Sequence, residues 1–81
     1  MSIRVLFFAS LADIAGGRER QVDSAEVKDV LSVFNKFTGE FPDMETHRAS
    51  VLFALNSEFV RSDAPVRDGD EIAFLPPVSG G

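Results

Sequence analysis

The residues of this sequence best suited to chemistry are its last two, Gly80 and Gly81. Because glycine has no Cβ, a chain that ends in two glycines can enter a narrow channel and approach another backbone closely. Its terminal carboxylate could attack the α-phosphate of ATP to form an acyl-adenylate, from which a sulfur nucleophile could displace AMP. We therefore expect the carboxylate of Gly81 to be the reactive group. Alternatively, the two glycines could stand at the chain end by chance and have no chemical function.

Two prolines separate this end from the rest of the chain. Pro76 and Pro77 lack backbone N–H groups and hold φ at about −65°, so a strand must stop there and the chain must leave it extended. We expect one folded domain over residues 1–75, followed by an extended flexible tail over residues 76–81.

Side chains elsewhere offer weaker chemistry. His47 is the only histidine, so it has no second histidine with which to share a metal ion. Asp68 and Asp70 flank a glycine, but the spaced ligands and closing glutamate of a calcium loop are absent, and we interpret them as turn residues. Gly16 and Gly17 lack the lysine and hydroxyl residue of a phosphate-binding loop, and we expect a hairpin turn there. The sequence predicts no metal site.

Composition excludes several classes of function. With 81 residues, 44% hydrophobic and 26% charged, the chain has the balance of a single folded domain. It has no cysteine, which excludes disulfides, thiolate zinc sites and a cysteine nucleophile. A net charge of −5 repels phosphate backbones and favours basic partners, so we expect no nucleic acid ligand.

Targeting patterns are weak as well. The apolar run from Met1 to Ser10 is short, is interrupted by Arg4 and lacks the cleavage pattern of a signal peptide. No stretch approaches the roughly 18 to 20 apolar residues of a membrane span. We expect no membrane insertion and a cytoplasmic location.

Hydrophobic periodicity predicts the elements that position the tail. Alternating apolar residues predict strands at about 2–9, 18–23, 51–55, 59–60 and 71–75. The last of these runs directly into the prolines.

One helix is predicted over residues 25–38, with Ser24 as its N-cap and Gly39 as its left-handed stop. Its apolar residues recur at helical spacing and form one stripe: Val27, Val30, Leu31, Phe34 and Phe37. Residues 39–50 are polar and irregular. Because the element order lacks a regular βαβ alternation, the sequence predicts an α+β fold, with one main helix packed across a mixed sheet.

The two faces of this sheet should differ. If Ile3, Val5 and Phe7 face the helix, then the residues between them point away from it. The same alternation in the last strand turns Leu75 outward beside Ala73. We therefore expect an exposed apolar patch beside the tail, a partner interface made of Leu6, Phe8, Phe59 and Leu75. A covering loop, or a register shifted by one residue, would remove it.

Three segments resemble a known family. The end of the chain from Val66 to Gly81, V-R-D-G-D-E-I-A-F-L-P-P-V-S-G-G, is similar to the C-terminus of the small, sulfur-carrying subunits of molybdopterin synthase. Residues 3–9 resemble their first strand, and residues 54–56 their third. Ser79 stands where threonine is common. The resemblance implies a ubiquitin-like β-grasp fold with a sheet of four to five strands.

The resemblance also implies a function. A ubiquitin-activating-type enzyme would use ATP to adenylate Gly81, and a sulfurtransferase system would convert it to a thiocarboxylate. The large subunit of molybdopterin synthase would join this chain in a heterotetramer and transfer the sulfur to a cyclic pyranopterin precursor. The chain would bind no cofactor and supply no catalytic side chain. The residues expected to enter the large subunit are Pro76, Pro77, Val78, Ser79 and Gly80.

Other functions share the same features. The glycine pair and fold also occur in sulfur carriers for thiamine or cysteine synthesis. A ubiquitin-like protein modifier would join Gly81 to lysines of its targets. A plain interaction module would use only the apolar face and no terminal chemistry.

Overall fold

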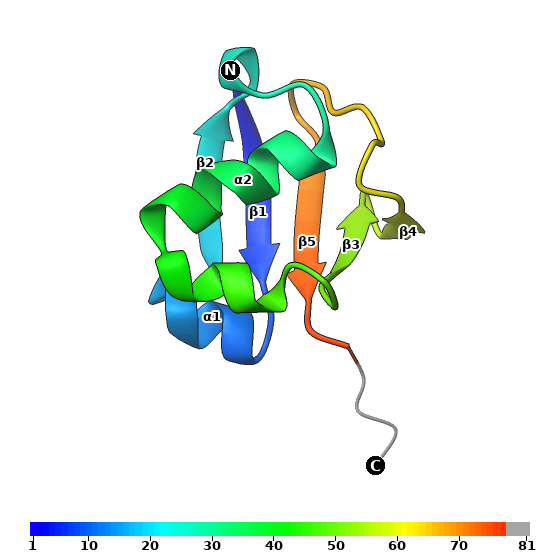
Figure 1. The fold of residues 1–81 in the computed structure, drawn as a ribbon. Helices are drawn as coiled ribbons and strands as arrows, with labels where there is room; N and C mark the ends of the chain where they lie inside the picture. The colour runs from blue at the N-terminus through cyan, green and yellow to red at the C-terminus, as the bar shows by residue number, and fades with distance from the viewer. Residues whose placement is uncertain (78–81) are drawn as a thin grey trace.

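The computed structural model describes residues 1–77, and residues 78–81 lie outside the described part. Its centre is a mixed sheet with the strand order β2-β1-β5-β3-β4 (Figure 1). The parallel pair, β1 and β5, lies at the middle, and the other neighbours are antiparallel. The bounds of the strands are β1 Ser2–Phe7, β2 Glu19–Asp23, β3 Leu52–Leu55, β4 Glu58–Val60 and β5 Glu71–Leu75.

All five predicted strands are present, and β1 ends two residues earlier than expected. The alternation of side chains is confirmed as well: Ile3, Val5 and Phe7 are buried. In β5 the residues that face the same way, Ile72 and Phe74, are buried too. This match between sequence pattern and burial fixes which face of the sheet meets the helices.

The main helix, α2 (Val30–Glu40), begins later than predicted. Ser24 does not cap it, because residues Ser24–Glu26 form a separate 3-10 turn, η1, on which the Asp23 side chain accepts the Ala25 N–H. Asp29 is the N-cap and accepts the Ser32 N–H at 2.8 Å, while the Ser32 hydroxyl accepts the Asp29 N–H. This reciprocal capping box outweighs the isolated Ser24 signal.

The end of α2 and its buried stripe also differ from the prediction. Gly39 lies inside the helix, which continues to Glu40. The helix stops there because Pro42 disfavours the helical region for the residue before it, Phe41. Val27 lies outside the helix and Leu31 is only half-buried. The stripe that reaches the core is Val30, Val33, Phe34 and Phe37.

A short helix, α1 (Ser10–Ala15), replaces the hairpin turn predicted at Gly16 and Gly17. Gly16 has φ of 74°, and the N–H groups of Gly16 and Gly17 donate to the carbonyls of Asp13 and Ala12, which ends the helix in a Schellman motif. Six residues are too few to show helical periodicity, so the sequence pattern could not reveal α1. β1 and β2 still pair antiparallel, as predicted.

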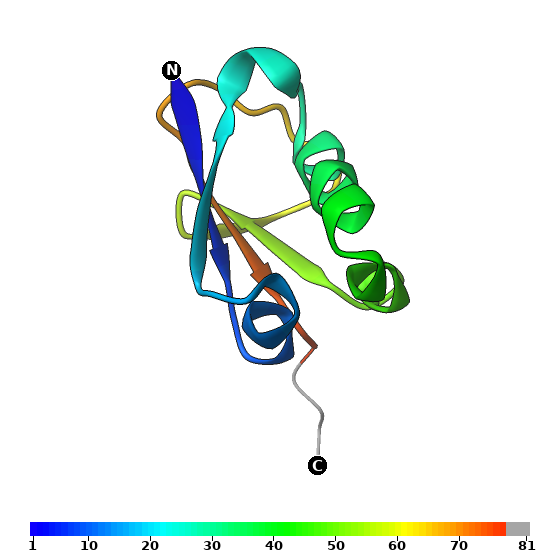
Figure 2. The same cartoon turned by 90° about the vertical axis from the view of Figure 1, so that its left-hand side faces the viewer.

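The helices gather on one side of the sheet, and among the described residues no helix covers the other side (Figure 2). A six-residue 3-10 helix, η2 (Pro42–His47), occupies the segment predicted to be irregular and buries Met44. Phenylalanine rings fill the space between sheet and helices. The Phe7 and Phe37 centroids are 5.0 Å apart, and those of Phe34 and Phe74 are 5.3 Å apart, both edge to face.

One main helix across a five-stranded mixed sheet, with the first and last strands parallel and adjacent, is the ubiquitin-like β-grasp arrangement. The expected α+β fold class is therefore confirmed. No helix within residues 1–77 is both long enough and apolar enough to cross a membrane.

Candidate functional site: the outer face of the sheet and the start of the tail

The tail begins at the end of β5, which lies between β1 and β3 in the sheet. Phe8 donates its N–H to the Phe74 carbonyl at 3.2 Å, and Leu75 pairs with Leu52. Pro76 is half-buried and Pro77 is exposed. The chain therefore leaves the sheet beside its central strands. The predicted site residues Val78, Ser79, Gly80 and Gly81 lie outside the described residues.

A row of apolar residues crosses the side of the sheet away from the helices, which we call the outer face. Leu6 pairs with Ala73, Ala73 pairs with Ala54, and Ala54 pairs with Phe59. This register places four apolar side chains in line across β1, β5, β3 and β4.

A second apolar row lies nearer the tail. It contains the pair Leu75 and Leu52, with Phe8 following β1. Of the four large hydrophobic residues exposed in residues 1–77, three lie on the outer face: Phe8 (44%), Leu52 (40%) and Phe59 (72%). The fourth is Met1. We call Leu6, Phe8, Leu52, Phe59 and Leu75 the outer patch.

The structure thus brings together the four residues predicted for the apolar patch, Leu6, Phe8, Phe59 and Leu75. Sequence reasoning missed Leu52. The alternation in residues 51–55 contained the signal, because Leu52 and Ala54 must face opposite to Phe53 and Leu55. An exposed apolar surface of this kind is typical of a site that binds another protein.

Charged residues border the outer patch at the end where β1 begins. Arg4 lies between two carboxylates: its Nη2 is 2.7 Å from Glu71 Oε2 and its Nε is 3.8 Å from Glu19 Oε1. All three side chains are about one-third to one-half exposed. The outer face is therefore charged toward the start of β1 and apolar toward the tail, so its two ends differ in polarity.

A turn anchors the start of β5. Asn56 accepts the Glu71 N–H on its Oδ1 at 3.0 Å and donates from its Nδ2 to Asp70. Asp70 also accepts the Arg67 N–H at 2.8 Å, and Gly69 has φ of 87°. The prediction that Asp68 and Asp70 are turn residues is confirmed. This network holds the register of the strand that leads into the tail.

A second turn shapes the outer patch near Phe8. Ala9 has φ of 52° and ψ of −127°, a conformation that favours glycine, and the Leu11 N–H donates to the Phe8 carbonyl at 3.1 Å. This tight turn directs the chain into α1. Phe7 therefore stays in the core while Phe8 remains 44% exposed. No pattern in the sequence predicts this strained turn.

The remaining polar side chains of residues 1–77 gather into no metal centre. His47 is half-buried in η2, where its backbone carbonyl accepts the N–H groups of Ser50 and Val51. No group of three metal-ligating side chains occurs in the described residues, and they enclose no pocket. The described geometry places the start of the tail, Pro76 and Pro77, beside an exposed apolar surface.

Comparisons with known proteins match the whole chain. The model of the ThiS family matches residues 5–81. The molybdopterin synthase sulfur carrier subunit of Chlamydomonas reinhardtii is 36% identical over 86 residues, covering 100% of both chains. Among solved structures, SAMP1 from Haloferax volcanii has a TM-score of 0.83 at 30% identity, again over 100% of both chains.

A structure of a complex is also similar. A chain in the protein–protein complex of subunits 1 and 2 of molybdopterin-converting factor from Helicobacter pylori has a TM-score of 0.70 at 26% identity, with 100% of both chains covered. These similarities confirm the ubiquitin-like β-grasp fold.

Proposed function

The chain belongs to the ThiS family, and we propose that it is the sulfur carrier subunit of a molybdopterin synthase. The observation that carries this proposal is where the tail starts: β5 ends at Leu75, and Pro76 and Pro77 follow it at the apolar end of the outer face. The sequence then ends in Gly80 and Gly81. Curated relatives named molybdopterin synthase sulfur carrier subunit support this reading over the full length of the chain.

The proposed chemistry takes place at the carboxylate of Gly81. One carboxylate oxygen attacks the α-phosphate of ATP on an adenylating enzyme, and pyrophosphate leaves. Sulfide released by a sulfurtransferase system then attacks the carbonyl carbon, AMP leaves, and loss of a proton gives the thiocarboxylate. The thiocarboxylate sulfur bonds to the pyranopterin precursor, and hydrolysis of the acyl–sulfur bond by water then leaves the sulfur on the precursor and returns the carboxylate. Two such carriers supply the two sulfurs of one dithiolene.

The outer patch is the surface we propose for the large subunit, with which the chain would form a heterotetramer. An apolar surface continuous with the tail positions the tail in the partner while it buries Leu6, Phe8 and Phe59. The similar complex of subunits 1 and 2 from Helicobacter pylori supports a partner of this kind. The need for ATP fits the proposed cytoplasmic location.

Mass spectrometry of the intact protein tests the proposed chemistry. The full chain is incubated with the adenylating enzyme of its own organism, ATP and sulfide. We expect an adenylate, followed by a species heavier by one oxygen-to-sulfur exchange at Gly81. A variant extended by one alanine after Gly81 is the matched control and should show neither species. Failure of the native chain to form either species would reject the proposal.

A protein modifier is the second candidate, favoured by the similarity to SAMP1, a small archaeal modifier protein. In that case Gly81 would form amide bonds with lysines of other proteins. Adducts that survive reducing agent and disappear when Gly81 is deleted would support this function. Sulfur carriage for thiamine or cysteine synthesis would instead be revealed by the enzyme that co-purifies with the chain.

A further inference from the structure

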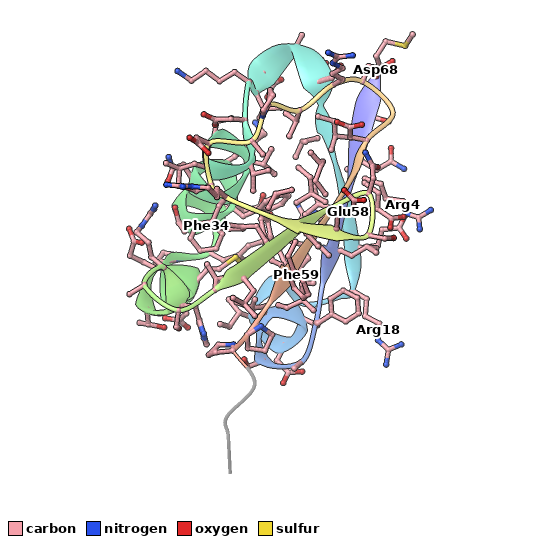
Figure 3. All side chains as sticks on the ribbon, turned by 90° about the vertical axis from the view of Figure 1, so that its right-hand side faces the viewer. Arg4, Arg18, Phe34, Glu58, Phe59 and Asp68 are labelled. Carbon is pink, nitrogen blue, oxygen red and sulfur yellow. The ribbon has the colours of Figure 1, made fainter. Side chains whose placement is uncertain are left out.

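Arg18 lies at the tail end of the outer face. Its carbonyl accepts the N–H of Phe7 at 2.8 Å, so its backbone adjoins the end of β1, next to Phe8. The Arg18 side chain is exposed and projects on the side of the sheet away from α2, as does that of Arg4 (Figure 3).

Within residues 1–77, Arg18 has no carboxylate within ion-pair distance. The chain has thirteen acidic and eight basic residues, so carboxylates are in excess. Arg4, Arg20, Lys36 and Arg48 each pair with at least one glutamate. Lys28, Arg61 and Arg67 also lack such a partner in residues 1–77, but Arg18 is the one whose backbone adjoins the end of β1 beside Phe8, where its charge is available to a molecule that covers the outer patch.

The surface beside Arg18 is open to close approach. A Cβ added to Gly16 or Gly17 would meet no atom within 4 Å. The surface at these two glycines is therefore open and carries no side chain. Phe8 is 44% exposed on the neighbouring strand end. A partner segment that covers Phe8 can therefore reach the Arg18 guanidinium without displacing any side chain of Gly16 or Gly17.

We propose that Arg18 is a specificity residue, which binds a carboxylate of the protein partner that covers the outer patch. This proposal rests on the proposed function, because the partner it describes is the large subunit. At this edge the large subunit should carry an apolar surface that covers Phe8 and an acidic side chain next to it. A guanidinium can bind a carboxylate through two parallel hydrogen bonds, which fixes orientation as well as charge. A charge at an interface rim mainly alters the association rate and its dependence on salt.

Arg67 provides a matched control. It is exposed and has no ion pair within residues 1–77, but it lies at the opposite end of the sheet, where Gly69 donates its N–H to the Ser2 carbonyl. The variants Arg18→Glu and Arg67→Glu make the same change in net charge. A general electrostatic effect would weaken binding equally in both, whereas a specific contact separates them.

The test measures the dissociation constant and association rate of the full chain with the large molybdopterin synthase subunit of its own organism, at low and high salt. We expect Arg18→Glu to weaken binding about fivefold at low salt and to flatten the salt dependence. Arg67→Glu should stay within about twofold, and Arg18→Lys should recover most of the association rate. Thermal unfolding of each variant checks that the fold is retained.

The outcomes separate the two proposals. Equal effects of Arg18→Glu and Arg67→Glu, or no effect of either, would overturn the role of Arg18 and leave the proposed function intact. Absence of any binding between the native chain and the large subunit would instead reject the proposed function, and with it the contact that depends on it.

Discussion

Leu75, the last residue of β5, lies directly opposite Leu52 of β3, and the next residue of the chain is Pro76. This pairing joins the outer patch to the tail without any intervening loop. A partner that covers Leu52 and Leu75 must therefore meet the tail at its first residue. The described part of the tail is thus continuous with the outer patch.

Phe59→Ala tests the outer patch. Phe59 is 72% exposed at the far end of the apolar row, so its loss should change the free energy of unfolding by less than about 1 kcal/mol. It should weaken binding to the large subunit by about 1 to 2 kcal/mol, as expected for an aromatic contact residue. Isothermal titration calorimetry measures the effect, and Asn35→Ala, an exposed position on α2, is the control. Equal affinities of both variants would exclude Phe59 from the interface.

Asn56 tests the turn that anchors β5. It has φ of 51° and makes two side-chain hydrogen bonds, to the Glu71 N–H and to Asp70. Asn56→Ala should destabilise the protein by about 2 kcal/mol, because it loses these bonds and because alanine tolerates the left-handed region less well than asparagine does. Asn56→Gly loses only the bonds and should cost about 1 kcal/mol. Urea unfolding distinguishes them, and the reverse order would contradict the role of backbone strain.

Ala9→Gly tests the strained turn next to Phe8. With φ of 52° and ψ of −127°, Ala9 stores strain that glycine would release, and we expect a gain of about 1 kcal/mol in the free energy of unfolding. Ala12→Gly, inside α1, is the matched control and should lose about 0.5 to 1 kcal/mol. Thermal or urea unfolding of both variants checks the prediction, and a loss in Ala9→Gly would disprove the strain.

Much of the sheet could be predicted from the sequence because burial follows period-two alternation directly. The buried residues alternate in both central strands: Ile3, Val5 and Phe7 in β1, and Ile72 and Phe74 in β5. Any shift of register by one residue would turn a whole set of apolar side chains away from the core. The start of α2 was mispredicted because two cap signals compete. Ser24 is a good N-cap residue, but only Asp29 has a partner, Ser32, at the spacing that closes a capping box.

The apolar part of the candidate site could be predicted because Leu6, Phe8, Phe59 and Leu75 follow from the same alternation. Features that depend on three-dimensional context could not be predicted. The strained turn at Ala9 and the short helix α1 leave no periodic signal. That Arg18 has no carboxylate of residues 1–77 within ion-pair distance emerges only when the strands are assembled.

Formation of molybdopterin in a reconstituted reaction tests the central claim most directly. The native chain and a variant with one alanine added after Gly81 are each supplied with the large subunit, the adenylating enzyme, ATP, a sulfur source and the pyranopterin precursor. We predict product from the native chain and none from the extended one, although both should bind the large subunit through the outer patch. Equal product from the two chains would show that the carboxylate of Gly81 is not the working group.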